Sequence, residues 1–252
     1  MARASGGVSV SVSLFAAAAL VGGWFALGTL ASSTDEPAPA YAWAPDELGP
    51  AVPVTAAPSA VASDVSTAVQ MVDRAWLAQT AARTGIPERP LAAYAAAELV
   101  LAAEQPGCGV GWNTLAGIGA IESGHGTHGG SAIDAAGNAL PRILGPALDG
   151  NGFAAIPDTE GGVWDSDPVW DRAVGPMQFI PSTWARWGAD GNGDGATDPN
   201  NIDDAALAAG RYLCASGSML TGEGWRAAIF SYNHLNSYVD AVAAEANRYA
   251  QG

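Results

Sequence analysis

The chain contains no lysine, so all 10 of its basic residues are arginine. This absence excludes the enzyme classes that depend on a P-loop lysine, a Schiff-base lysine or a Ser-Lys dyad. The basic residues are outnumbered by 25 acidic ones, which gives a formal net charge of -15. Because phosphate recognition needs clustered basic side chains, we exclude nucleic acid as a partner.

Charged residues are also scarce, at 14% of the chain, and they are missing altogether from Val8 to Leu30. This run contains no proline and follows Arg3, a pattern typical of export segments. At about 23 residues it is long enough to span a bilayer. We therefore expect residues 1–34 to direct export, and we favour an uncleaved membrane anchor over a cleaved signal peptide.

Residues 35–65 are rich in Pro, Ala, Ser and Val without a sustained period, which predicts a linker ahead of a folded part at residues 66–252. Only two cysteines are present, Cys108 and Cys214, and no CxxC spacing indicates zinc or redox chemistry. In an exported protein, an even number of cysteines favours a disulfide. We predict that the two pair, the alternative being two buried thiols.

Helical periodicity and Gly or Pro stop signals divide the folded part into a series of expected helices. Residues 124–170 are instead dominated by Gly, Pro, Asp and Asn, which predicts a long functional loop region with brief strands at pieces such as Arg142–Leu144. The fold class is thus mainly α with minor strands. The expected helices are a first one running from Ser66 to about Gly85, followed by residues 89–104, 112–123, 177–187, 203–215, 223–232 and 237–249.

Glu122 lies at the end of one expected helix, directly after the apolar stretch Ile118–Ile121. Partial burial disfavours the charged form of a carboxyl group and raises its pKa. Such a group holds a proton near neutral pH and can donate it to a glycosidic oxygen. Glu122 is therefore the leading candidate for an acid catalyst.

The string IESGHG at residues 121–126 is followed downstream by AVGPMQFIPSTW at residues 173–184. Asp203-Asp204-Ala205, Tyr212-Leu213-Cys214 and Tyr232-Asn233 extend the pattern. Together these strings resemble the lytic murein transglycosylases, and most closely their membrane-bound B-type branch, over roughly residues 70–250.

The resemblance implies a lysozyme-like catalytic domain that acts on peptidoglycan glycan strands. With the export segment, we expect the protein to act outside the cytoplasm, membrane-anchored or secreted to the cell wall, as a monomer without an organic cofactor. The resemblance gives Glu122 the role of acid and then base in forming a 1,6-anhydro ring. One carboxyl suffices for this reaction, because an intramolecular hydroxyl has a high effective molarity. The resemblance also implies substrate contacts for Ser123, Gln178, Tyr232 and Asn233.

The string DGNGDGA at residues 190–196 fits the start of an EF-hand calcium loop. Its oxygen donors would be Asp190, Asn192, Asp194 and the carbonyl of Ala196. The twelfth position is Asn201 rather than the usual Glu, so Asp204 would complete the coordination. We expect one structural Ca²⁺, as the B-type resemblance also implies, with a metal-free turn as the alternative.

Two other functions fit the same residues. A hydrolase of the muramidase type needs a second carboxyl, which the loop acids could supply. A wall-binding module without activity is the other alternative, and the intact Glu122 argues against it. The three histidines His125, His128 and His234 lack an HExxH partner motif, so we do not expect a zinc peptidase. The loop acids are Asp134, Asp158, Glu160, Asp165 and Asp167.

Overall fold

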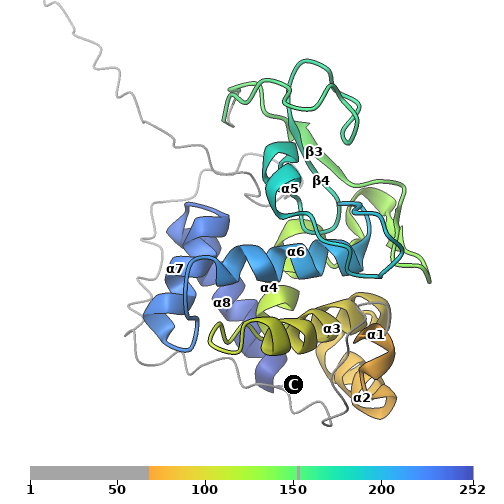
Figure 1. The fold of residues 1–252 in the computed structure, drawn as a ribbon, viewed down its shortest axis with the longest axis vertical. Helices are drawn as coiled ribbons and strands as arrows, with labels where there is room; N and C mark the ends of the chain where they lie inside the picture. Colours follow the sequence, from red (N-terminus) through yellow and green to blue (C-terminus); the bar gives the residue numbers. More distant parts are fainter. Residues whose placement is uncertain (1–67, 152–153, 252) are drawn as a thin grey trace, which may run out of the picture.

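The computed structural model describes residues 68–151 and 154–251. The expected export segment and linker lie outside the described residues. Helices dominate, and the strands are short, which confirms the mainly α fold class (Figure 1). No helix within the described ranges is long and apolar enough to cross a membrane.

The first expected helix is interrupted, and this part of the prediction was wrong. It forms α1 (Ala68–Met71) and α2 (Arg74–Thr84), separated at Asp73. The Asp73 carboxylate accepts a hydrogen bond from the Trp76 backbone N–H and thereby caps the start of α2. An apolar stripe that continues through the break could not reveal it.

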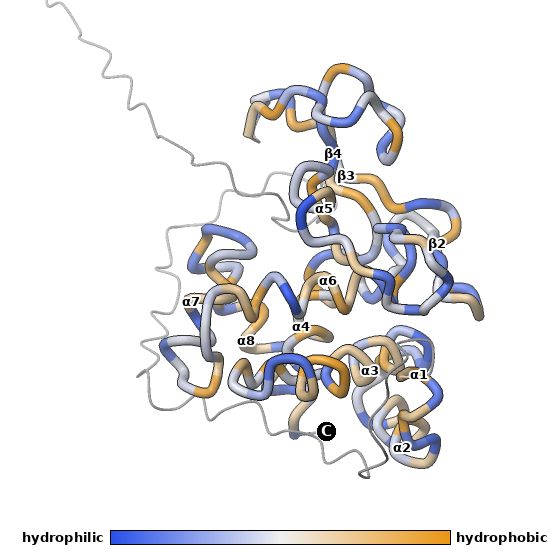
Figure 2. The backbone as a smooth tube through the Cα atoms, in the orientation of Figure 1, coloured by the Kyte–Doolittle hydropathy of each residue, from blue (hydrophilic) through white to orange (hydrophobic). Residues whose placement is uncertain are grey.

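The core is made by four helices, and Figure 1 shows α3 and α6 running across the centre with α4 and α8 next to them. Helix α3 packs on α6, and α4 packs on α8. The side chains inside are mostly Ala and Leu, and Figure 2 shows α3 in largely hydrophobic colours. The bounds of the four helices are α3 Glu88–Glu104, α4 Trp112–Ser123, α6 Ile202–Cys214 and α8 Asn236–Gln251.

Close approach of α4 to its neighbours depends on two glycines. A Cβ at Gly117 would lie 2.9 Å from the Val242 carbonyl oxygen of α8, and one at Gly119 would lie 2.1 Å from the Tyr94 hydroxyl of α3. Small residues therefore let α4 sit between α3 and α8. This places the end of α4, with Glu122, inside the helical body.

A lobe of loops and four short strands extends from this body (Figure 1). The described part of residues 124–170 includes a turn of 3-10 helix at His128–Gly130, and Figure 2 shows alternating hydrophilic and hydrophobic stretches there. The expected brief strand near Arg142–Leu144 begins two residues later. The strands form two antiparallel pairs, β1 (Ala132–Ile133) with β2 (Ala139–Leu140) and β3 (Leu144–Ala147) with β4 (Arg172–Val174).

The expected helix at residues 177–187 starts later than predicted. Helix α5 spans Pro181–Trp187, with Pro181 in its first turn, where a missing backbone N–H costs nothing. The preceding residues instead form a tight turn in which Gly175 and Gln178 have positive φ of 80° and 51°. A Cβ at Gly175 would lie 1.7 Å from the Pro199 carbonyl oxygen, so this turn requires glycine there.

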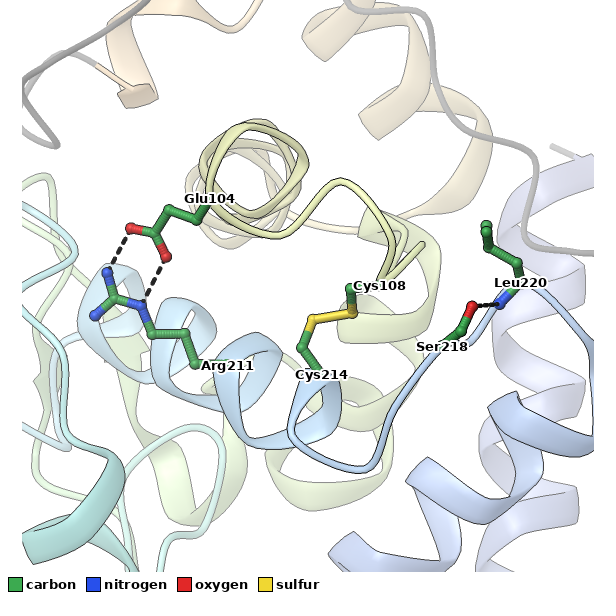
Figure 3. The surroundings of a disulfide bond; sticks show 6 residues. All are labelled: Glu104, Cys108, Arg211, Cys214, Ser218 and Leu220. Atoms are coloured by element: carbon green, nitrogen blue, oxygen red, sulfur yellow. Dashed lines mark hydrogen bonds and ion pairs between the residues drawn. A yellow bond between two sulfur atoms is a disulfide. The ribbon is translucent and has the colours of Figure 1, made fainter.

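The two cysteines form the predicted disulfide, with a Cα–Cα distance of 5.3 Å (Figure 3). It joins the segment after α3 to the end of α6, across 106 residues of sequence. In the same region, Arg211 of α6 forms an ion pair with Glu104 of α3 at 2.6 Å. Helix α7 (Gly222–Tyr232) follows and leads to α8.

Candidate active site

Glu122 lies in the last turn of α4 and is 6% exposed. The helix ends at Gly124, whose φ of 58° is left-handed and whose N–H bonds back to the Ala120 carbonyl. Burial raises the pKa of Glu122 from 4.5 to about 8. The prediction that its surroundings favour the protonated form agrees with this shift.

Tyr238 of α8 is the direct partner of Glu122. Its hydroxyl donates a hydrogen bond of 2.6 Å to Oε1 of Glu122, and this bond opposes part of the pKa increase that burial causes. Burial and the nearby carboxyl raise the pKa of Tyr238 well above its usual value, so it remains a donor.

Tyr232, at the end of α7, stacks on the ring of Tyr238 with an interplanar angle of 3° and ring centroids 6.5 Å apart. Its hydroxyl donates to the Met177 carbonyl at 2.7 Å. The predicted substrate residue thus connects α7 to the turn that precedes α5. Its ring also packs against Tyr238, the tyrosine that contacts Glu122.

Ser123 connects the same turn to the end of α4. Its hydroxyl donates to the Pro176 carbonyl at 2.6 Å and accepts from the Gly126 N–H at 2.8 Å. Residues 175–178 are therefore anchored by Ser123 on one side and by Tyr232 on the other. These two hydrogen bonds bring the turn at residues 175–178 next to the end of α4, although the two segments are more than 50 residues apart in sequence.

Gln178 and Asn233 are both buried at this junction, at 8% and 1% exposure. The Gln178 side-chain amide donates to the Gly175 carbonyl at 2.8 Å, which stabilises the turn. Asn233 follows Tyr232 as the C-cap of α7. The predicted roles of Ser123, Gln178, Tyr232 and Asn233 as substrate contacts stay predictions.

Sequence reasoning missed Tyr238. It lies six residues after Tyr232 on the next helix, and no motif marked it. A hydroxyl-bearing aromatic residue on the apolar stripe of α8 was the only signal that could have identified it, because a buried Tyr needs a polar partner.

The five loop acids considered as second carboxyls all accept hydrogen bonds from backbone N–H groups of their own loops. Asp158, for example, accepts from Gly161 and Gly162 within a tight turn. Asp165 accepts from the backbone N–H groups of Asp167 and Arg172. These contacts give the acids a role in loop folding.

The acidic string at residues 190–196 forms a compact turn. Asp190 accepts from the N–H groups of Gly193, Asp194 and Gly195, and Asp194 accepts from that of Ala196. Such inward-facing carboxylates fold the loop around themselves.

Asp204, at the start of α6, also faces this loop. It is 1% exposed and accepts from Gly191 and Asp198, and burial raises its pKa to about 6. Within the described ranges, no group of three or more His, Cys, Asp or Glu side chains is arranged to hold a metal ion. Calcium binding by Asp190, Asn192, Asp194, Ala196 and Asp204 stays a prediction.

The three histidines differ in burial and in the residues they contact. His128 and His234 are exposed, and the His234 ring contacts Phe230. His125 is buried between two tyrosines. The expectation that the histidines do not bind zinc stays a prediction.

A family model described as a transglycosylase SLT domain matches residues 167–229. The comparisons with curated proteins and with solved structures found no match. The matched segment contains the turn at residues 175–178, α5, α6 and most of α7, whereas Glu122 and Tyr238 lie outside it. The match supports a place in the lytic transglycosylase and lysozyme-like superfamily, and it supports transglycosylase-type action on peptidoglycan.

Proposed function

We propose that this protein is a lytic transglycosylase that cleaves the β-1,4 bond between N-acetylmuramic acid and N-acetylglucosamine without consuming water. The observation that carries the proposal is one buried carboxyl group, Glu122, whose pKa is raised to about 8 and which receives a hydrogen bond from Tyr238. A group with this pKa holds its proton at neutral pH and can still release it during a reaction.

The proposed reaction uses the two states of this carboxyl in sequence. Glu122 donates its proton to the glycosidic oxygen, and the bond from that oxygen to the muramic C1 breaks. The hydroxyl on C6 of the same sugar attacks C1 and closes the 1,6-anhydro ring, while its proton returns to Glu122. The Tyr238 hydroxyl stabilises the carboxylate between the two transfers.

Three further points belong to the proposal. The enzyme is of the membrane-bound B-type, acts as a monomer outside the cytoplasm, and is attached by its N-terminal segment. Ser123, Gln178, Tyr232 and Asn233 bind the glycan strand near Glu122. One calcium ion steadies the loop at residues 190–204, and no step of the reaction depends on it.

Digestion of purified peptidoglycan sacculi followed by mass spectrometry tests the chemistry. We expect products with anhydro ends, which are one water lighter than the reducing ends that a hydrolase leaves. Glu122→Gln should stop product formation, and Glu104→Gln should not, because Glu104 lies on the far end of α3 beside Arg211. Reducing ends alone would identify a muramidase, and inactivity of the unaltered protein would favour a wall-binding module.

A further inference from the structure

His125 is a buried titratable residue that the proposed reaction does not use. It follows Glu122 by three residues and is 8% exposed. Its φ of 60° is left-handed, and its N–H donates to the Gly119 carbonyl at 2.9 Å. His125 thus directly follows Gly124, the residue that ends α4, and lies three residues beyond Glu122.

The His125 imidazole lies between two tyrosine hydroxyls from different helices. Nδ1 is 3.3 Å from the hydroxyl of Tyr94 in α3, and Nε2 is 2.9 Å from that of Tyr249 in α8. The ring centroids are 5.9 Å and 5.7 Å apart. A neutral imidazole has one donor and one acceptor nitrogen, so it can bond both hydroxyls at once.

The Tyr94 hydroxyl also lies directly on α4, at the place where Gly119 has no side chain. Tyr249 is also contacted by Arg248, whose guanidinium lies 4.3 Å from the ring centroid and pairs with Glu245. Both partners of His125 are therefore fixed independently. An imidazole bonded to both ties the end of α4 to α3 and to α8.

We propose that His125 is a positioning residue that holds Glu122 at its buried place by bridging Tyr94 and Tyr249. The proposal rests on the proposed function of Glu122. Without the bridge, the last turn of α4 loosens and water reaches the carboxyl group. Displacement of a catalytic group by about 1 Å lowers the rate by up to about 100-fold.

The charged and titratable groups that face His125 are Tyr94 on α3 and Tyr249, Glu245 and Arg248 on α8. Burial, opposed in part by Glu245, lowers the pKa of His125 to about 4. The imidazole is therefore neutral above about pH 4, and Glu122 holds its proton below about pH 8. The bridge and the protonated acid exist together at neutral pH.

Three variants of the full chain test the bridge. His125→Phe keeps a ring but loses both hydrogen bonds, His125→Gln keeps a donor and an acceptor, and Tyr249→Phe removes one hydroxyl from the other side. We expect His125→Phe to lower kcat about 10- to 100-fold with little change in KM. Activity should recover in part in His125→Gln, and the milder Tyr249→Phe should fall between wild type and His125→Phe.

The pH profile supplies a readout that a loss of stability alone would not move. The alkaline limb of kcat/KM reports the pKa of the acid, and hydration of Glu122 lowers that pKa. In His125→Phe and Tyr249→Phe the alkaline limb should move to lower pH. Met219→Ala, which opens a cavity beside the disulfide region, should lower stability without moving the limb.

Wild-type kcat and an unmoved alkaline limb in both His125→Phe and Tyr249→Phe would overturn the positioning role. Failure of the proposed function looks different, because Glu122→Gln would then retain cleavage whatever the His125 variants do. If His125→Phe does not fold, Tyr249→Phe alone decides the question.

Discussion

Glu122 and Asp167, a carboxylate of the loop between β3 and β4, are similar groups in opposite surroundings. Glu122 is buried among apolar helices with one hydroxyl donor, and burial raises its pKa to about 8. Asp167 in the loop accepts from two backbone N–H groups and from Arg172, and these contacts lower its pKa. The packed helices favour the protonated form of Glu122, whereas the N–H donors and Arg172 around Asp167 favour its anion.

The largest expected effect is on catalysis, where the same substitution at Glu122 and at a loop carboxyl should give different losses of cleavage. Glu122→Gln should lower peptidoglycan cleavage about 10²- to 10⁴-fold, because a general acid contributes that much. Glu160→Gln, the same change within the loop, should leave cleavage within about threefold, since Glu160 bonds backbone groups of its own turn. Product release from sacculi under identical conditions measures both, and equal losses would erase the distinction.

The second effect is a pH-dependent gain in stability for Glu122→Gln. Between about pH 4.5 and 8 the folded state holds the Glu122 proton that the unfolded state has released, so the free energy of unfolding falls as pH rises through this window. Gln cannot titrate and still accepts from Tyr238. Urea unfolding should show the variant gaining up to a few kcal/mol over wild type near the upper end of this window, at about 1.4 kcal/mol for each pKa unit.

The lower end of the same window is the control for that measurement. Below about pH 4.5 both states of the wild type hold the proton, so the two proteins should differ little there. A stability difference independent of pH would mean that Glu122 is not buried as a neutral group.

The third effect concerns the anchor of the loop. Asp171 is fully buried and accepts from the backbone N–H and the hydroxyl of Thr159. Asp171→Asn should cost about 1–3 kcal/mol of stability, because an amide N–H donor replaces a buried carboxylate oxygen that accepts from Thr159. Limited proteolysis should then cut faster within residues 154–171 while the helices remain resistant. Protection equal to that of the wild type would show that the loop does not depend on Asp171.

The smallest effect is at the loop surface. Arg172→Gln removes an ion pair of 2.9 Å with Asp167, in which both side chains are partly exposed. Such pairs contribute little and are screened by salt. The change in thermal midpoint should be near the limit of detection and should vanish at high ionic strength. A large loss that persists in salt would show that the pair acts inside the fold.

The sequence allowed several parts of the fold to be predicted because the signals for them are local. The helix over residues 112–123 was predicted with its observed bounds, since small and apolar residues fill it and a glycine ends it. The disulfide between Cys108 and Cys214 followed from an even count, without any information on distance. The helix expected from residue 177 was wrong because apolar residues in a tight buried turn resemble a helical stripe until Pro181 starts the real one.

The residues of the candidate site also fall into those that the sequence indicated and those that only the structure shows. Glu122 stood out because an acidic residue ended an apolar helix, and its partners in the turn at residues 175–178 were found through a resembling string. Tyr238 and the bridge of His125 to Tyr94 and Tyr249 had no such signal. Their contacts join α4 with α3 and α8, whose sequences carry only ordinary helical patterns.

The amino-acid sequence by itself determined most of the helices, the candidate acid and the pairing of its two cysteines, because periodicity, chain breakers and residue chemistry act over a few residues. Only the tertiary structure decided how strongly Glu122 holds its proton. That property depends on how much water the packed helices exclude and on which hydroxyl they bring within 2.6 Å of the carboxyl group.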